Sequence, residues 1–147
     1  MTFIQVLHIL AAGIWLGGLV FTSTVVTPAF KRMEWTPAER MAVRSVVGRQ
    51  YSKVARANLG ALLALAIIVF ALRGGAVALA ETILVALSFL LAELHASYYA
   101  PRLAQAAREQ AHELRQRLLR ISISVSMFNL LLSVGIVVLA VLTWGRA

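Results

Sequence analysis

His8 is the first residue of this chain whose type and position could support chemistry. It lies in an apolar run from Phe3 to Pro28 that contains no Lys, Arg, Asp or Glu. An ionisable side chain at membrane depth is costly and is by default a functional candidate. A neutral imidazole can bind haem iron or copper. The alternative is a packed histidine that donates a hydrogen bond to a neighbouring carbonyl or carboxylate, and residue types alone leave both interpretations open.

The residues around His8 fit a site for a metal or a flat ligand. Trp15 shares the helical face of His8, and Gly17 and Gly18 follow it. Glycines at this place would let another backbone, or a flat ligand such as haem, come close. Met1 and Met127 are the candidates for a second haem ligand beside His8, as are water or His8 of a second subunit.

Glu93 and His95 are ionisable residues near the other end of a later apolar run. Two residues are separated by about 200° around a helix, so this pair does not form a ready-made metal site. His95 remains a ligand candidate by itself, and Glu93 a candidate for a polar interior. We expect about 15 Å between His8 and His95 along the membrane normal, too far for one haem to take both in one subunit.

Small polar residues form a stripe near the C-terminus of the chain. Ser122, Ser126, Asn129 and Ser133 recur at helical spacing, which predicts that they share one face. Such residues are typical of helix contacts in bilayers, so packing is the first interpretation. The second is a polar path for an ion or proton, which Thr22 could extend.

The elements that must position these residues are membrane helices. The 147 residues are 61% hydrophobic and 14% charged, with a mean hydropathy of +0.83, which is too apolar for a soluble domain. About 20 apolar residues span a bilayer. The sequence predicts one all-α transmembrane domain over residues 1–147, an antiparallel up-down four-helix bundle. The expected spans are about 3–28, 54–72, 76–99 and 118–144.

The connections predict the orientation of the bundle. Twelve of the fourteen Lys and Arg residues lie in the two connections 31–53 and 101–117 or within three residues of them. The positive-inside rule therefore places the connections 31–53 and 101–117 in the cytoplasm, with both termini outside, in the inner (plasma) membrane. Thr36, Pro37 and Glu39 form a capping box that predicts a helix start. Pro101 should kink or stop the third span, and an exposed helix should cover residues 102–117.

Several classes of function are disfavoured by composition. The chain has no cysteine, which removes disulfides and thiolate chemistry. The net charge of +8 sits in the connections, where it contacts lipid head groups, so nucleic acid is not an expected partner. No phosphate loop, zinc-protease motif or serine–histidine–acid arrangement is present, and the sequence does not indicate an enzyme. The expected surroundings are the lipid bilayer, with a homo-oligomer or partner membrane subunits as further alternatives.

The segment Leu7–Leu19 resembles the first helix of the copper-resistance D (CopD-like) family, in which a histidine is followed seven residues later by tryptophan and then by glycines. Val26-Thr27-Pro28, Tyr98-Tyr99-Ala100-Pro101 and the region from Ser124 to Asn129 are similar to small four-helix members of that group. More distantly, the group also resembles the haem-binding four-helix bacterial protoporphyrinogen oxidase.

The resemblance implies copper or related metal homeostasis, with His8 as the carried-over ligand. It leaves open a protein that binds haem b for redox chemistry or haem handling, and a non-catalytic helical subunit of a larger membrane complex. The cofactor is therefore expected to be copper or haem b, if there is one.

Overall fold

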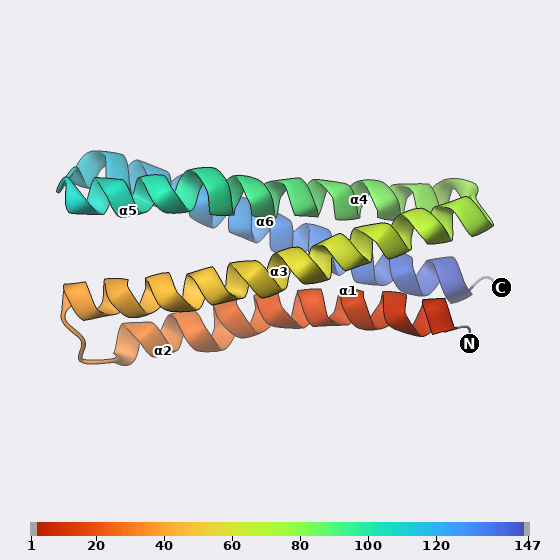
Figure 1. Ribbon diagram of the computed structural model, residues 1–147, viewed down its shortest axis with the longest axis horizontal. Coiled ribbons are helices and arrows are strands. Elements are labelled where there is room, and N and C mark those ends of the chain that lie inside the picture. The colour runs from red at the N-terminus through yellow and green to blue at the C-terminus, as the bar shows by residue number, and fades with distance from the viewer. Residues whose placement is uncertain (1–2, 146–147) are drawn as a thin grey trace.

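The computed structural model describes residues 3–145, without the side chains of residues 37, 38, 41 and 145. These residues form long helices and no strand, in four antiparallel rods (Figure 1). The first rod consists of α1 (Phe3–Phe21), the π-helical turn η1 (Thr22–Val26) and α2 (Thr27–Arg32), and the second is α3 (Pro37–Arg73). The third consists of α4 (Gly75–Leu94), the π-helical turn η2 (His95–Tyr99) and α5 (Ala100–Arg108), and the fourth is α6 (His112–Gly145). The predicted all-α four-helix bundle is confirmed.

The surface of the bundle is that of a protein surrounded by lipid. Four helical stretches are long and apolar enough to cross a membrane: Phe3–Arg32, Ala42–Arg73, Gly75–Arg108 and His112–Trp144. Large apolar side chains such as Phe3, Leu72 and Leu131 are mostly exposed. In water such exposure would be unfavourable, at roughly 25 cal/mol for each Å² of apolar surface. The chain is a multi-pass membrane protein.

The four rods form a closed ring. α1 packs against α3 and α6, and α4 packs against the same two helices, so α1 and α4 face each other across the bundle. Both run in the same direction, away from the end where α1 begins and α6 finishes (Figure 1). We call this end the termini end and the opposite one the loop end. At the loop end the pair α2–α3 lies apart from the pair α5–α6 (Figure 1).

The start of α3 confirms the predicted capping box. The Thr36 side chain accepts a hydrogen bond from the Glu39 amide, while the Glu39 carboxylate accepts one from the Thr36 amide at 2.8 Å. These contacts satisfy donors that the first turn of a helix leaves free. A proline at the first helical position adds to the signal.

The capping box should make the first turn of α3 sensitive to acid. Hydrogen bonds from Thr36 hold the pKa of Glu39 below its usual value. A lowered pKa in the folded state means that the stabilisation is present above the unfolded pKa and is lost as pH falls through the folded pKa. We therefore expect faster amide exchange, after correction for intrinsic pH dependence, at Thr36 and Glu39 in mildly acidic buffer. A Thr36→Ala variant should show this loss of protection already at neutral pH.

Pro101 does not stop the third rod, and the equivalent Pro28 does not stop the first. In both rods a π-helical turn ends two residues before the proline. The Thr27 amide bonds to the Thr22 carbonyl and the Ala100 amide to the His95 carbonyl, five residues back. A proline lacks the N–H donor and its ring crowds the carbonyl four residues earlier. The wider turn makes room for the ring, so the helix continues.

The sequence predicts one continuous helix over residues 102–117, and the structure has two helices there instead. The structure ends α5 at Arg108 and begins α6 at His112, with the reversal at residues 109–111. Gln110 adopts a positive φ of 54°, and the Ala111 amide bonds to the Ala106 carbonyl. No glycine or proline marks this reversal in the sequence, which is why composition alone favours an unbroken helix there.

Candidate functional site

A buried histidine–glutamate pair lies at the termini end of the bundle. His8 on α1 and Glu81 on α4 meet across the ring, with 3.0 Å between His8 Nε2 and Glu81 Oε1. His8 is 0% exposed and Glu81 is 1% exposed. Removing a carboxylate from water costs several kcal/mol unless partners compensate. This pair is therefore the costliest ionisable feature that the sequence places inside the bundle.

The two facing atoms of the pair have no partner except each other. His8 Nε2 and Glu81 Oε1 are both fully buried, lie 3.0 Å apart, and have no other hydrogen-bond partner. The remaining atoms of the pair do have partners. Thr143 Oγ1 donates to Glu81 Oε2 at 3.1 Å, and Trp144 Nε1 donates to His8 Nδ1 at 3.4 Å. The facing atoms Nε2 and Oε1 therefore depend on each other alone.

Sequence reasoning missed Glu81, although a signal for it exists. The residue is a carboxylate inside an apolar run, which by itself marks a candidate site. A second signal is spacing: His8 precedes Pro28 by the same number of residues as Glu81 precedes Pro101. The two residues thus occupy equivalent positions in parallel rods and come to the same depth. The alternative of a packed histidine beside a carboxylate describes this contact, and it leaves the ligand hypothesis open.

An apolar layer closes the site toward the middle of the bundle. Ala12, Val85 and Ile136 follow His8, Glu81 and Thr143 on their helices, in the direction of the loop end, and all three are at most 1% exposed. They belong to the main hydrophobic core together with Leu59 and Leu62. The site therefore has no polar connection to the next polar layer in this conformation.

The second polar layer contains residues of the predicted stripe and Trp15. Trp15 Nε1 donates to Ser133 Oγ at 2.8 Å, and Ser133 Oγ donates to the Asn129 carbonyl at 2.7 Å. Ser88, which sequence reasoning also missed, donates to Asn129 Oδ1 at 2.6 Å. All four side chains are buried. This layer joins α1, α4 and α6 by hydrogen bonds, as the packing interpretation of the stripe requires.

Asn129→Leu should be only mildly destabilising if this layer serves packing. Interhelical hydrogen bonds in bilayers are each worth about 0.6 kcal/mol on average. Because the freed Ser88 hydroxyl can bond to a carbonyl of its own helix, we expect a loss of about 1 kcal/mol in unfolding free energy. A double-mutant cycle with Ser88→Ala measures the coupling. A coupling energy of zero would contradict the Ser88–Asn129 hydrogen bond.

Glu93 and His95 take different partners, as expected from their separation around the helix. Glu93 is half-buried and pairs with Arg56 on α3, with 2.6 Å between Arg56 Nε and Glu93 Oε1. His95 Nδ1 lies 3.4 Å from Ser122 Oγ on α6. His95 and Glu81 are separated by fourteen residues of one rod, which is about 20 Å. His95 is therefore too far away to share a ligand with His8.

The structure places several other candidate residues outside the bundle interior. Ser126 is exposed, whereas Ser122 and Asn129 on either side of it along α6 are buried. Met127 is 54% exposed and lies 16 residues before Thr143 on α6, so in one subunit it cannot be the partner of His8. Gly17 is exposed with nothing close to it, and Met1 lies outside the described residues.

Two candidates near the middle of the first rod have local roles. Thr22 is half-buried, its hydroxyl donates to the Gly18 carbonyl of its own helix, and its side chain interacts with Tyr51. Gly18 lies against the ring of Tyr51, which would be 3.6 Å from an added Cβ. The close approach expected at the glycines is therefore found at Gly18, with an aromatic side chain as the neighbour.

The site offers two protein ligands to a metal ion. Within residues 3–145, no group of three or more His, Asp or Glu side chains converges in a way that could hold a metal. His8 and Glu81 could therefore supply two protein ligands, fewer than the three of a typical catalytic zinc site or the four of a structural one.

The comparisons with known proteins assign a family and no function. Residues 10–112 match the family model described as "Domain of unknown function (DUF4149)", which covers most of the chain. The chain belongs to the DUF4149 family. No curated protein and no solved structure matches it. In this DUF4149 protein the matched region includes Trp15, Glu81 and Ser88. It begins at residue 10, two residues after His8.

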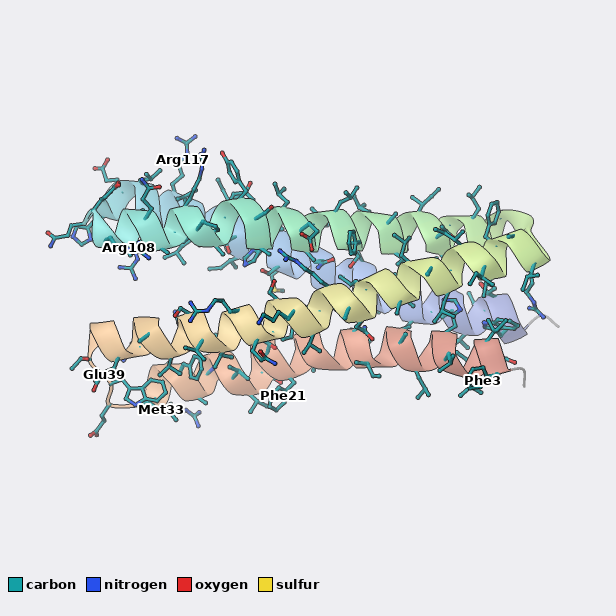
Figure 2. The ribbon with its side chains drawn as sticks, in the orientation of Figure 1. Phe3, Phe21, Met33, Glu39, Arg108 and Arg117 are labelled. Atoms are coloured by element: carbon teal, nitrogen blue, oxygen red, sulfur yellow. The ribbon has the colours of Figure 1, made fainter. Side chains whose placement is uncertain are left out.

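Labelled side chains mark the two ends of this DUF4149 protein (Figure 2). Arg108 and Arg117 lie at the loop end, and Phe3 lies at the termini end, on the outside of the bundle (Figure 2). Four of the six Glu side chains of the chain, Glu34, Glu39, Glu109 and Glu113, also lie toward the loop end, and Glu93 lies near the middle of the third rod. Glu81 lies at the opposite end and inside the bundle.

Proposed function

We propose that this protein binds a divalent metal cation at His8 and Glu81 and takes part in metal homeostasis in the inner membrane. Copper is the metal that the resemblance to the CopD-like family implies. The observation that carries the proposal is the pair of buried, facing atoms His8 Nε2 and Glu81 Oε1, which lie 3.0 Å apart without any other hydrogen-bond partner. When the imidazole proton leaves Nε2, an imidazole lone pair and a carboxylate oxygen face a common point, where a cation can bind both.

The donor set fits such an ion. Imidazole nitrogen and carboxylate oxygen each bind zinc at about 2.0–2.2 Å, which puts two ligands of a tetrahedral ion about 3.3 Å apart. The observed separation of 3.0 Å therefore needs only a small widening. A nitrogen and oxygen donor set favours divalent copper or zinc over Cu(I), which prefers sulfur ligands. Thr143 would orient the carboxylate through its bond to Oε2.

The position of the pair supports handling of the metal at the outer face. If the basic connections face the cytoplasm, as the positive-inside rule predicts, then the termini end faces outward. The apolar layer of Ala12, Val85 and Ile136 then lies between the site and the cytoplasm. A metal bound at the pair would therefore have a shorter path to the outer aqueous phase than to the cytoplasm.

Metal content of the purified protein tests the proposal. We expect one equivalent of Cu²⁺ or Zn²⁺ per chain after equilibrium dialysis in detergent, and none above background in His8→Ala or Glu81→Ala. His112→Ala is the matched control, because His112 is exposed at the loop end, and it should bind like the wild type. Equal binding by His8→Ala would refute the site.

The same preparation distinguishes the two alternatives. A Soret band that His8→Ala abolishes would establish haem in place of a simple cation, and it would require the protein atoms around both ring nitrogens of His8 to move. A preparation without metal or haem that purifies only with other membrane proteins would favour a non-catalytic subunit.

A further inference from the structure

The contacts of Trp144 place a side chain between the His8–Glu81 pair and the termini end of the bundle. Its indole Nε1 donates to His8 Nδ1, and its ring lies under the Arg73 guanidinium, with 4.2 Å from Arg73 Cζ to the ring centroid. Arg73 also donates to the main-chain carbonyl of Thr143, and the Thr143 hydroxyl donates to Glu81. Trp144 thus connects His8 to Arg73, and Thr143 connects Glu81 to Arg73. Arg73 and Thr143 also line a surface hollow of about 450 Å³ at this end of the bundle.

We propose that Trp144, clamped by Arg73, is a lid on the metal site, and that a metal bound at His8 displaces the Trp144 indole. This inference rests on the proposed function and adds to it the residues that regulate access. The indole covers the Nδ1 edge of His8, and Arg73 places a positive charge beside it, which disfavours the arrival of a cation while the lid is closed.

The hydrogen bond of Trp144 fixes the tautomer of His8. An indole nitrogen donates and never accepts, so His8 Nδ1 must be the acceptor of this bond. The proton of the neutral imidazole then lies on Nε2, the atom that faces Glu81. In this state Nε2 has no lone pair for a metal.

Metal binding reverses these roles. A metal at Nε2 needs the lone pair of that atom, and the proton of the neutral ring then lies on Nδ1, which must find an acceptor. The Trp144 N–H and the His8 Nδ1–H would then be two donors facing each other, so the contact must open. At 3.4 Å the bond is long, and it gives little resistance to opening. The resistance comes from the cation–π contact and the hydrogen bond of Arg73.

Tryptophan emission tests the lid with Zn²⁺ as the probe, since this ion does not itself quench fluorescence as Cu²⁺ does. The contribution of Trp144 is the difference between the emission of the wild type and of Trp144→Phe, a variant that keeps an aromatic ring and loses the N–H donor. We expect Zn²⁺ to change this difference signal in a saturable way, with one equivalent bound to each protein by dialysis. His8→Ala should show no change.

The rate of binding gives a second, independent measurement. Arg73→Gln removes the cation above the indole, and we expect Zn²⁺ to associate about tenfold faster with this variant. Leu72→Ala is the matched control, because Leu72 is the exposed neighbour of Arg73 on α3, and it should leave the rate unchanged. If Zn²⁺ binds while the Trp144 signal and the Arg73→Gln rate both stay constant, the lid is wrong and the site stands. If Zn²⁺ does not bind to the wild type, the proposed function and the lid both fall.

Discussion

Replacing either member of the buried pair with leucine should destabilise the protein strongly, while replacing both together should not. His8→Leu leaves a carboxylate without its facing partner, and Glu81→Leu leaves an imidazole without one, at positions that are 0% and 1% exposed. Removing one partner of a buried pair typically costs about 3–5 kcal/mol, and replacing the whole pair by apolar residues is often neutral or stabilising. We expect the larger loss from His8→Leu, since an uncompensated carboxylate costs more than a neutral imidazole.

Reversible unfolding in mixed detergent measures these free energies. The four proteins of the cycle give a coupling energy that isolates the pair from the packing of each side chain. The double variant should also lose metal binding while it keeps the fold, which would separate function from stability. Additive losses from the two single variants would mean that His8 and Glu81 do not interact.

The second large effect concerns the apolar layer below the pair. Val85 and Ile136 are fully buried between the pair and the polar layer of Ser88, Asn129 and Ser133. The distance from Glu81 to Ser88 along α4 is about 10 Å, which a dry layer can close to protons and ions. The double variant Val85→Ser/Ile136→Ser supplies hydroxyls and space for water. Polar groups lower a barrier of this kind by about 2 kcal/mol, so proton flux across proteoliposomes should rise more than tenfold.

The wild type should be nearly proton-tight in the same assay. Leu131→Ser is the control, because Leu131 lies on α6 and is 68% exposed toward the lipid, so its replacement should leave the flux unchanged. Rapid proton flux through the wild type would contradict the closed layer. It would favour instead the polar path considered for the stripe of Ser122, Asn129 and Ser133.

The helical bundle could be predicted from the sequence because its causes are local. Runs of about 20 apolar residues, the charges between them and the capping box at Thr36 each act over a few turns of helix. The reversal at residues 109–111 could not be predicted, since its residues are good helix formers and the turn results from packing of α5 on α6. Pro101 marked a helix end in the sequence, while the neighbouring helices stabilise a wider turn instead.

Only one member of the candidate pair, His8, could be predicted from the sequence. His8 and Trp15 were found because polar or amphipathic residues stand out in an apolar helix. Glu81 was missed because its importance depends on which helix lies opposite α1, and the order of helices around the ring is a property of the whole bundle. Ser126 illustrates the same limit: helical periodicity puts it on the stripe, yet it is exposed between the buried Ser122 and Asn129.

The two halves of the chain follow one plan, and this explains where the pair lies. Each half is a rod with a π-helical turn before a proline, followed by a long return helix. His8 and Glu81 occupy equivalent positions of the two rods, as do Trp15 and Ser88, relative to Pro28 and Pro101. Polar residues at equivalent positions of parallel rods meet in layers across the bundle. Binding sites at the interface of two related halves are common in small membrane transporters.

X-ray absorption spectroscopy of the metal-loaded protein tests the central claim most directly, because it reports the atoms bound to the metal. For Cu²⁺ or Zn²⁺ we predict a first shell of nitrogen and oxygen at about 2.0–2.2 Å with the scattering pattern of one imidazole. That pattern should disappear in His8→Ala and persist in His112→Ala. A first shell that contains sulfur, or an imidazole signal that is unchanged in His8→Ala, would place the metal elsewhere and contradict the His8–Glu81 site.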